Sequence, residues 1–293
     1  MILVAGATGY LGREICRRLI DQGEPVHGLV RASSDPVVTK ELESMGVDLV
    51  VGDLRDRGSL DRACRGADAV ISTATTMRSR QPGDSIEMTD GTGQGDLVDA
   101  ARAAHVRRFS YVSHSEHIAG DDPLTLAKRS VERRIRESGM TYTVARPTCF
   151  MEVWLSPALG FDYANGNATI YGSGEHPVSW ISLFDVAQFV VRALVDVQAE
   201  NQTVELGGPD ALSPLEVVRV FEQVRGRSFA VQHVPVEALR AQRDSATDSL
   251  QRTFATLMLG VAAGDDIPMQ DTLRRYGLSF TPVSEYARQA MSS

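Results

Sequence analysis

Three glycines near the start of the chain constrain its fold most strongly. An apolar run stops at Gly6, further glycines follow at Gly9 and Gly12, and a helical pattern then begins. In a strand–turn–helix unit, the first glycine permits a sharp turn, the second lets a pyrophosphate approach, and the third lets helix and strand pack closely. The helix start adds N–H donors and a positive dipole end. The predicted phosphate-binding residues are Gly6, Thr8, Gly9, Tyr10, Leu11 and Gly12. The alternative is a glycine-rich turn that binds nothing.

Composition narrows the class of protein. A chain of 293 residues that is 43% hydrophobic suits one large α/β domain, or a main domain with a smaller attached part. The net charge of −8 argues against a nucleic-acid partner. The apolar runs are too short for a membrane span, and the first strand leaves no room for a secretion signal. The three cysteines lack Cys-x-x-Cys spacing, which favours a reducing compartment. We predict a soluble, cytoplasmic protein.

The second predicted strand, residues 25–30, ends at Arg31. In dinucleotide-binding units an acidic residue here bonds the ribose 2′-hydroxyl of NAD, whereas an arginine accommodates the 2′-phosphate of NADP. A guanidinium suits phosphate because it donates parallel, charge-assisted hydrogen bonds. Ser33 adds a hydroxyl donor. The sequence therefore predicts NADP(H) as the cofactor, and a solvated surface arginine is the alternative.

Two later strand ends supply further candidates for cofactor binding. The third predicted strand leads into Asp53 and Leu54, whose carboxylate and backbone could meet the adenine. A strand-end turn in which Asp53 caps the next helix is an equally open interpretation. The fourth predicted strand ends in small residues, including Thr73 and Thr75. Small side chains there leave room for a dinucleotide lying across the sheet.

Strand and helix patterns alternate at least five times, which is typical of a Rossmann-type, doubly wound parallel sheet. We predict an NADP-binding domain over residues 1–150. Residues 151–293 would form a smaller substrate-binding part, interleaved with the main sheet and mostly helical after residue 210. Residues 78–90 are polar and predict a loop, and the glycines between Gly91 and Gly95 indicate close helix packing.

An apolar stretch follows the sixth predicted strand. Phe150, Met151 and Trp154 could line a pocket for a planar or aromatic substrate, or they could form a core helix face. Near the carboxyl end, apolar residues between Leu250 and Met258 form one helix face. That face could pack on the domain or on a second copy, so a homodimer stays open.

These motifs together resemble the atypical short-chain dehydrogenase/reductase superfamily, in particular its NmrA-like branch. The likeness covers roughly residues 1–225. The matching pieces are residues 6–12, Val30-Arg31, Gly52-Asp53-Leu54, Tyr111-Val112-Ser113, Ala127-Lys128 with Glu132, residues 142–147 leading to residues 150–152, and residues 180–187. The resemblance implies an NADP-binding Rossmann domain with a smaller part over the substrate. Such families include quinone, isoflavone and lignan-type reductases, and also NADP-binding regulators without known turnover.

The chain departs from the superfamily at one important position. The usual motif is Tyr-x-x-x-Lys, in which tyrosine donates a proton to the carbonyl and lysine lowers its pKa. Here the lysine is Lys128, and Leu124 stands where the tyrosine would be. The resemblance implies that Lys128 holds the nicotinamide ribose and stabilises an oxyanion or relays a proton, as in branch members that lack the tyrosine. A surface lysine is the alternative.

A replacement proton donor is expected at the end of the fifth predicted strand, where open α/β sheets place their chemistry. Ser113 and His114 are the candidates, and His117 is a further histidine in the same segment. We predict an NADPH-dependent oxidoreductase that reduces an apolar or aromatic carbonyl, enone or quinone. The alternatives are a non-catalytic, NADP-binding redox sensor that acts on a partner, and an NADP-using isomerase or cyclase without net redox change.

Overall fold

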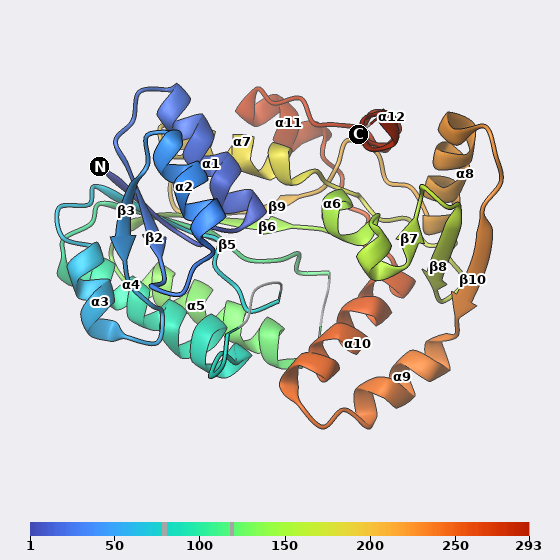
Figure 1. Ribbon diagram of the computed structural model, residues 1–293, viewed down its shortest axis with the longest axis horizontal. Helices are drawn as coiled ribbons and strands as arrows, with labels where there is room; N and C mark the ends of the chain where they lie inside the picture. Colours follow the sequence, from blue (N-terminus) through green and yellow to red (C-terminus); the bar gives the residue numbers. More distant parts are fainter. Residues whose placement is uncertain (78–80, 118–119, 293) are drawn as a thin grey trace. The chain divides into compact units, whose positions relative to one another are not determined.

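The computed structural model describes residues 1–77, 81–117 and 120–292 (Figure 1). The chain divides into two compact units, and each unit is assembled from separate stretches of sequence. Unit 1 consists of Met1–Ser113, Pro123–Ala145 and Ala187–Val204. Unit 2 consists of His114–Asp122, Arg146–Val186 and Glu205–Ser293.

The main sheet has seven strands in the order β3-β2-β1-β4-β5-β6-β9. They are β1 (Ile2–Ala5), β2 (Val26–Val30), β3 (Asp48–Val51), β4 (Ala69–Ser72), β5 (Arg108–Val112), β6 (Thr141–Pro147) and β9 (Gln202–Leu206). The pairs β1–β2, β2–β3, β1–β4, β4–β5 and β5–β6 are parallel. Strand order runs outward from β1 in both directions, so the carboxyl ends of β1 and β4 flank a topological switch point. The predicted Rossmann-type sheet is confirmed.

Helices cover both faces of this sheet (Figure 1). One face carries α1 (Tyr10–Asp21) and α2 (Pro36–Ser44), and the other carries α3 (Arg57–Ala63), α4 (Gln94–Ala103) and α5 (Pro123–Glu137). Later in the sequence, α7 (Leu183–Ala193) and the short η3 (Val197–Ala199) precede the last strand of the main sheet, β9. Asp35 caps α2 by accepting the Val37 N–H at 2.8 Å, and Pro36 follows in the first turn.

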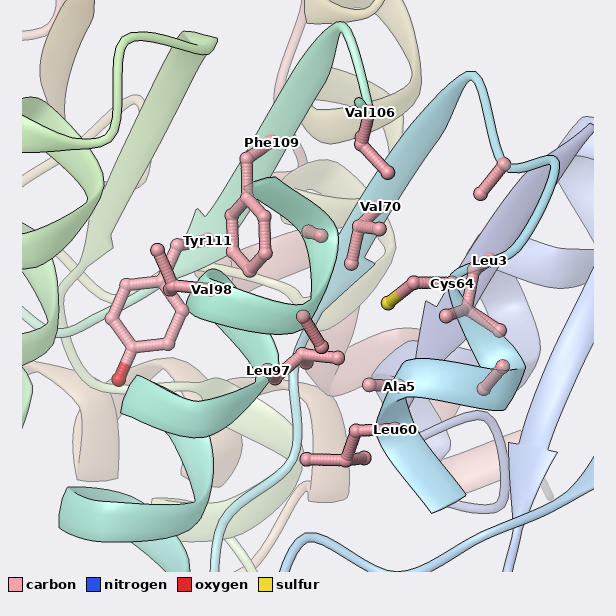
Figure 2. Close-up of a cluster of buried hydrophobic side chains, with 14 of the residues drawn as sticks. Leu3, Ala5, Leu60, Cys64, Val70, Leu97, Val98, Val106, Phe109 and Tyr111 are labelled. Atoms are coloured by element: carbon pink, nitrogen blue, oxygen red, sulfur yellow. The ribbon is translucent and has the colours of Figure 1, made fainter. Parts of the chain in front are cut away.

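Aliphatic and aromatic side chains from β1, β4 and β5 meet those of α3 and α4 in the core of unit 1 (Figure 2). Phe109 and Tyr111 lie two residues apart on β5 and therefore face the same side of the sheet. Tyr111 is buried at the edge of the cluster, and its hydroxyl points away from the labelled aliphatic side chains (Figure 2). Tyr111 therefore belongs to the core of unit 1.

The prediction of a loop over residues 78–90 is wrong at its carboxyl end. Residues 78–80 lie outside the described residues, but Ile86–Gly93 forms a π-helix, η1, that continues into α4. The prediction failed because the segment is polar in composition, although the π-helix buries the Asp90 side chain completely. The predicted close packing of the glycines holds at Gly93, where a Cβ would lie 2.5 Å from the Leu54 carbonyl oxygen.

Unit 2 contains a three-stranded sheet in the order β10-β8-β7. Its strands are β7 (Phe161–Asp162), β8 (Asn167–Tyr171) and β10 (Ala230–Val234), and its helices are α6 (Met151–Trp154), η2 (Pro157–Leu159), α8 (Pro214–Arg225), α9 (Val236–Asp244), α10 (Ser249–Ala263), α11 (Gln270–Tyr276) and α12 (Val283–Ser292). The core includes Phe161 and Phe221, whose ring centroids are 4.9 Å apart. Helices α8 to α12 make up most of the chain after residue 210. Strand β10 was not predicted because its residues are largely exposed and show no apolar alternation.

Among the described residues, no helix is long and apolar enough to cross a bilayer. The same residues hold no group of three or more His, Cys, Asp or Glu side chains that could bind a metal ion. Burial raises the pKa of the Cys16 and Cys64 thiols to about 12, which fits their role as small apolar fillers.

Candidate cofactor and active site

The glycine turn between β1 and α1 has the geometry that the sequence predicts. Gly6 adopts φ of +87°, and its carbonyl accepts the Gly9 N–H at 3.0 Å. A Cβ on Gly12 would lie 2.0 Å from the Gly6 carbonyl oxygen, so no other residue fits without moving the backbone. Gly9 is the N-cap of α1 and brings no capping side chain. The start of this helix therefore suits an anionic phosphate group.

The turn also contacts the segment that follows β4. A Cβ on Gly6 would lie 2.6 Å from the Thr73 hydroxyl oxygen and 2.7 Å from the Ala74 nitrogen. The Thr73 N–H donates to the Ala5 carbonyl at 2.9 Å, which fixes this segment against β1. Thr75 accepts the Met77 N–H at 3.4 Å. Small residues thus lie on both sides of the switch point, where open α/β sheets bind nucleotides.

Arg31 follows β2 and is held by a buried carboxylate. Its Nη1 atom lies 2.6 Å from Oδ2 of Asp84, a side chain that is only 1% exposed. Arg55 approaches the other carboxylate oxygen of Asp84 at 3.4 Å. Ser33, which was predicted to assist Arg31, instead donates its hydroxyl to the Gln81 side chain. The Arg31 guanidinium is therefore fixed before any phosphate arrives, and Asp84 would compete with that phosphate.

Asp53 follows β3 and is engaged with Arg55. The Arg55 Nη2 atom donates to Asp53 Oδ2 at 2.7 Å, and this bond is the main reason that the pKa of Asp53 is lowered. The alternative interpretation, in which Asp53 caps the next helix, is wrong because Asp56 caps α3 through the Gly58 N–H. Leu54 is buried against Gly93. Sequence reasoning missed Arg55, although a second cation two residues after Asp53 was a usable signal.

Lys128 lies on α5 and is buried, with 6% of its surface exposed. Its ammonium donates to the carbonyl of Val112, the last residue of β5, at 3.2 Å, and lies 5.3 Å from the centre of the Tyr111 ring. Burial lowers the pKa of Lys128, Asp90 and Glu132 oppose this effect, and nearby Arg129 adds to it. The surface-lysine alternative is therefore wrong.

The only other lysine in the chain is Lys40, among 30 lysines and arginines in total. Lys40 is exposed on α2. At nearly every basic position this chain uses arginine, which cannot release its proton under ordinary conditions. The rarity of lysine in such a chain is a signal that sequence reasoning could have used more strongly.

Ser113 takes part in a buried ionic network. Its hydroxyl donates to Glu132 Oε1 at 2.6 Å and accepts from Arg129 at 3.1 Å. Arg129 and Arg136 also pair with Glu132, which is fully buried. This arrangement holds the end of β5 against α5, the helix that carries Lys128.

Two buried polar groups beside Lys128 were not predicted. The Tyr111 hydroxyl and one carboxylate oxygen of Asp90 have no hydrogen-bond partner among the described residues. The other Asp90 oxygen accepts from the Thr76 hydroxyl at 2.6 Å and from its N–H at 3.0 Å. Burial, and then Asp90 and Glu132, raise the pKa of Tyr111 well above its usual range. Leu124, four residues before Lys128, is buried and apolar.

Four predicted residues belong to unit 2. His114 and Met151 are buried, and Met151 is part of the unit 2 core. Phe150 precedes α6, and its backbone bridges to Ile181. Trp154 packs edge-on against Tyr171, with their ring centroids 6.3 Å apart.

A second acid–base cluster lies within unit 2. The Ser115 hydroxyl donates to Asp265 Oδ1 at 3.0 Å, and His117 Nδ1 lies 3.2 Å from the same oxygen. Asp265 is 1% exposed in its side chain, whereas His117 is 52% exposed. Burial raises the pKa of Asp265 to about 6, while Ser115 and His117 act to lower it and Glu205 adds to the rise. Sequence reasoning could not find Asp265, which is 150 residues from Ser115.

Replacing Asp265 with asparagine is expected to stabilise unit 2 at neutral pH. Because folding raises the pKa of this carboxyl from 3.8 to about 6, ionisation favours the unfolded chain. The resulting cost is absent below pH ~4, grows as pH rises to ~6, and reaches at most about 3 kcal/mol above that. Urea unfolding of D265N and the wild type at pH 8 and pH 4.5 tests this. A free energy of unfolding at pH 8 that is no higher in D265N than in the wild type would contradict this prediction.

Comparisons with known proteins place the chain in a family. Residues 1–287 match the NmrA-like family, and the chain belongs to that family. It is 35% identical over 242 residues to the (4-alkanoyl-5-oxo-2,5-dihydrofuran-3-yl)methyl phosphate reductase of Streptomyces griseus, covering 82% of this chain and 79% of that protein. It is 30% identical over 280 residues to the NAD(P)H azoreductase of Xenophilus azovorans, covering 92% of each. It is also 30% identical over 246 residues to the photosystem II assembly factor Ycf39 of Trieres chinensis, covering 82% and 73%.

Solved structures share the fold. The NADPH-dependent quinone oxidoreductase of Escherichia coli, solved with NADPH, superposes with a TM-score of 0.80 at 21% identity, covering 99% of this chain and 100% of that one. An isoflavone reductase gives a TM-score of 0.77 at 24% identity, covering 99% and 98%. At these identities the likeness establishes the Rossmann-type fold.

Proposed function

We propose that the protein is an NADPH-dependent reductase of a small organic molecule. The observation that carries this proposal is the buried Lys128 ammonium at the carboxyl end of β5, in the same unit as a tight glycine turn of the kind that accepts a dinucleotide. The reductase names of two relatives that are at least 30% identical support the same reaction class. The cofactor is NADP(H), and when bound it supplies a hydride.

The residues of unit 1 have separate roles in this proposal. Gly6, Gly9 and Gly12 admit the pyrophosphate to the start of α1. Arg31, oriented by Asp84, binds the 2′-phosphate. Asp53, Leu54, Thr73 and Thr75 border the nucleotide along the carboxyl ends of β3 and β4, and Tyr10 and Leu11 begin the phosphate-binding helix. Lys128 holds the ribose and stabilises negative charge that develops on the substrate oxygen, while Ser113 fixes α5 through Glu132.

The substrate proposed is apolar or aromatic: a carbonyl compound, an enone or a quinone. Phe150 and Trp154 offer aromatic surface in unit 2, and Met151 supports them from the core. His114, in the segment after β5, is retained as a candidate proton donor. The protein would orient the acceptor and exclude water from it. Incubating the protein with NADPH and a panel of quinones, aromatic ketones and enones tests this, with absorbance of NADPH as the readout.

Replacing Arg31 with alanine is expected to weaken NADPH binding about 30-fold, because charge-assisted hydrogen bonds to the 2′-phosphate contribute about 2 kcal/mol. The dissociation constant of NADH should change by less than about 3-fold, because NADH has no such phosphate. Calorimetric titration measures both values. Arg107→Ala, at a site that is 79% exposed, is the matched control. An equal loss of both nucleotides would refute the role of Arg31.

A second candidate function is an NADP-binding regulator that acts through a partner. Leu124 in place of the proton-donating tyrosine favours it, as does the similarity to a photosystem II assembly factor. This candidate predicts nucleotide binding without consumption of NADPH by any acceptor in the panel. An isomerase or cyclase that uses NADP without net redox change makes the same prediction for NADPH, but would convert its substrate.

A further inference from the structure

We propose that the turn of residues 81–84 is an internal competitor of the 2′-phosphate, and that Asp84 thereby limits how strongly the protein prefers NADPH to NADH. The inference rests on the proposed role of Arg31 in binding that phosphate and extends it. The turn and the residues that it contacts all belong to unit 1.

The turn engages both residues that were predicted to contact the 2′-phosphate. Oδ2 of Asp84 lies 2.6 Å from Arg31 Nη1. The Gln81 side chain accepts the Ser33 hydroxyl and donates to the Ser33 carbonyl at 3.2 Å. A carboxylate that served only to orient Arg31 would not need the contacts with Ser33. A phosphate at the end of β2 would use the same donors, a guanidinium and a serine hydroxyl, so the turn and the phosphate compete for them.

Hydrogen bonds and a glycine fix the conformation of the turn. The Asp84 N–H donates to the Gln81 carbonyl at 2.9 Å, and the Gln81 N–H donates to Asp84 Oδ2 at 2.8 Å. Gly83 has φ of +88°, and a Cβ there would lie 2.9 Å from Arg55 Nη1. The same Arg55 atom donates to the Pro82 carbonyl at 2.9 Å. The turn is therefore shaped to present the Asp84 carboxylate to arginine side chains.

The charges of this cluster balance without a nucleotide. Arg31 and Arg55 contribute two positive charges. Asp53 and Asp84, which pair with them, contribute two negative charges. A phosphate monoester adds about −1.5 to −2 charge at neutral pH. If Asp84 stayed in place, the phosphate would meet a neutral cluster and a carboxylate of like sign. Once Asp84 leaves Arg31, the cluster has one excess positive charge, which attracts the phosphate.

Asp84 is bound incompletely, which makes its displacement feasible. Its side chain is 1% exposed, and Arg55 Nη1 approaches Oδ1 only to 3.4 Å. Among the described residues, Oδ1 has no hydrogen-bond partner. A buried carboxylate oxygen without such a partner carries a desolvation cost, and water would relieve that cost after displacement. NADH has no 2′-phosphate with which to replace the carboxylate, so only NADPH competes with Asp84 for Arg31.

Calorimetric titration with adenosine 2′,5′-bisphosphate and with 5′-AMP tests the competition without requiring turnover. In D84N the bisphosphate should bind about 10-fold more tightly, because a neutral amide competes less well than a carboxylate for a guanidinium. The dissociation constant of 5′-AMP should change by less than about 2-fold, because this ligand has no 2′-phosphate. The double variant R31A/D84N should bind the bisphosphate no more tightly than R31A.

D61N is the matched control for the change in charge. Asp61 pairs with Arg57 at 2.8 Å on α3, so D61N removes one negative charge from unit 1 without altering the contacts of Arg31. Both dissociation constants should stay at their wild-type values. A gain in D61N as large as that in D84N would overturn the proposal, because it would assign the effect to net charge rather than to competition at Arg31.

The other outcomes separate the inference from the proposed function. Bisphosphate binding that is no tighter in D84N than in the wild type would overturn the inference and leave Asp84 as an orienting group. Q81A provides a second variant that keeps the Asp84 side chain and removes the contacts with Ser33. It should bind the bisphosphate about 3-fold more tightly, the effect of losing neutral hydrogen bonds from the turn, and an unchanged value would also overturn the inference. Equal wild-type affinity for the two ligands would instead overturn the assignment of Arg31 to the 2′-phosphate.

Amide hydrogen exchange, measured by NMR, follows the displacement itself. The Gln81 N–H donates to Asp84 Oδ2 at 2.8 Å, so it should exchange faster when saturating NADP+ displaces the carboxylate. Saturating NAD+ should leave its exchange rate unchanged. An equally slow rate with NADP+ bound would show that the carboxylate stays in place, and would overturn the proposal.

Discussion

Replacing Lys128 with methionine is expected to lower the turnover number with NADPH by about 100-fold, the effect of removing one preorganised charge that stabilises a developing oxyanion. Methionine keeps the length of the side chain and removes the ammonium. The free energy of unfolding should not fall, because burial already disfavours this ammonium, as the lowered pKa of Lys128 indicates. Loss of turnover with retained stability would separate a chemical role from a structural one.

The chain provides a matched control for this experiment. Lys40, the only other lysine, is exposed on α2, so Lys40→Met should leave turnover unchanged. Because there are only two lysines, NMR of their side chains reports Lys128 directly, with Lys40 as the reference. Because the pKa of Lys128 is lowered from 10.5, its ammonium should lose its proton at a lower pH than an ordinary lysine, and turnover should fall over the same pH range. Normal turnover in K128M would refute the role of Lys128.

Replacing Gly12 with alanine is expected to destabilise the protein by about 3 kcal/mol and to weaken NADPH binding at least about 100-fold. The added Cβ would lie 2.0 Å from the carbonyl oxygen of Gly6, and a contact between backbone and Cβ cannot be relieved by a side-chain rotation. The turn must move, and with it the N–H groups that face the phosphates. Urea unfolding and calorimetric titration measure the two effects.

Two other glycines separate loss of folding from loss of binding. At Gly9 a Cβ would meet the Gly6 oxygen at 3.3 Å, so Gly9→Ala should fold and still weaken NADPH by blocking the approach of the pyrophosphate. At Gly58 in α3 the nearest atom would be 3.4 Å away, an ordinary contact, so Gly58→Ala should change neither property. Unimpaired NADPH binding in both G9A and G12A would mean that the turn does not hold the dinucleotide.

The local features of unit 1 could be predicted because each depends on neighbouring residues. The glycine turn, the Asp35 cap and the alternation of strands with helices all follow from patterns within about 20 residues. The switch point between β1 and β4 follows in turn from the Rossmann-type order, which those alternations imply. The family resemblance pointed to Lys128, and its burial explains why a lysine rather than an arginine occupies that site.

The partners of these residues could not be predicted, because they come from distant parts of the sequence. Asp84 binds Arg31 across 53 residues, and Asp265 meets Ser115 across 150. The residues that flank Asp84 and Asp265 in the sequence do not distinguish them from aspartates on the protein surface. The π-helix around Asp90 was missed for a related reason, since a polar stretch looks like a loop unless its buried contacts are known.

The most direct test of the proposed reductase activity follows the hydrogen that the acceptor receives. The protein would be incubated with NADPH that carries deuterium at both C4 positions and with benzylideneacetone or an aromatic ketone, and the product analysed by mass spectrometry. We predict one deuterium on carbon for each NADPH consumed, with the yield strongly reduced in K128M. Tight binding of NADPH without oxidation by any ketone, enone or quinone would contradict the reductase and favour the regulator.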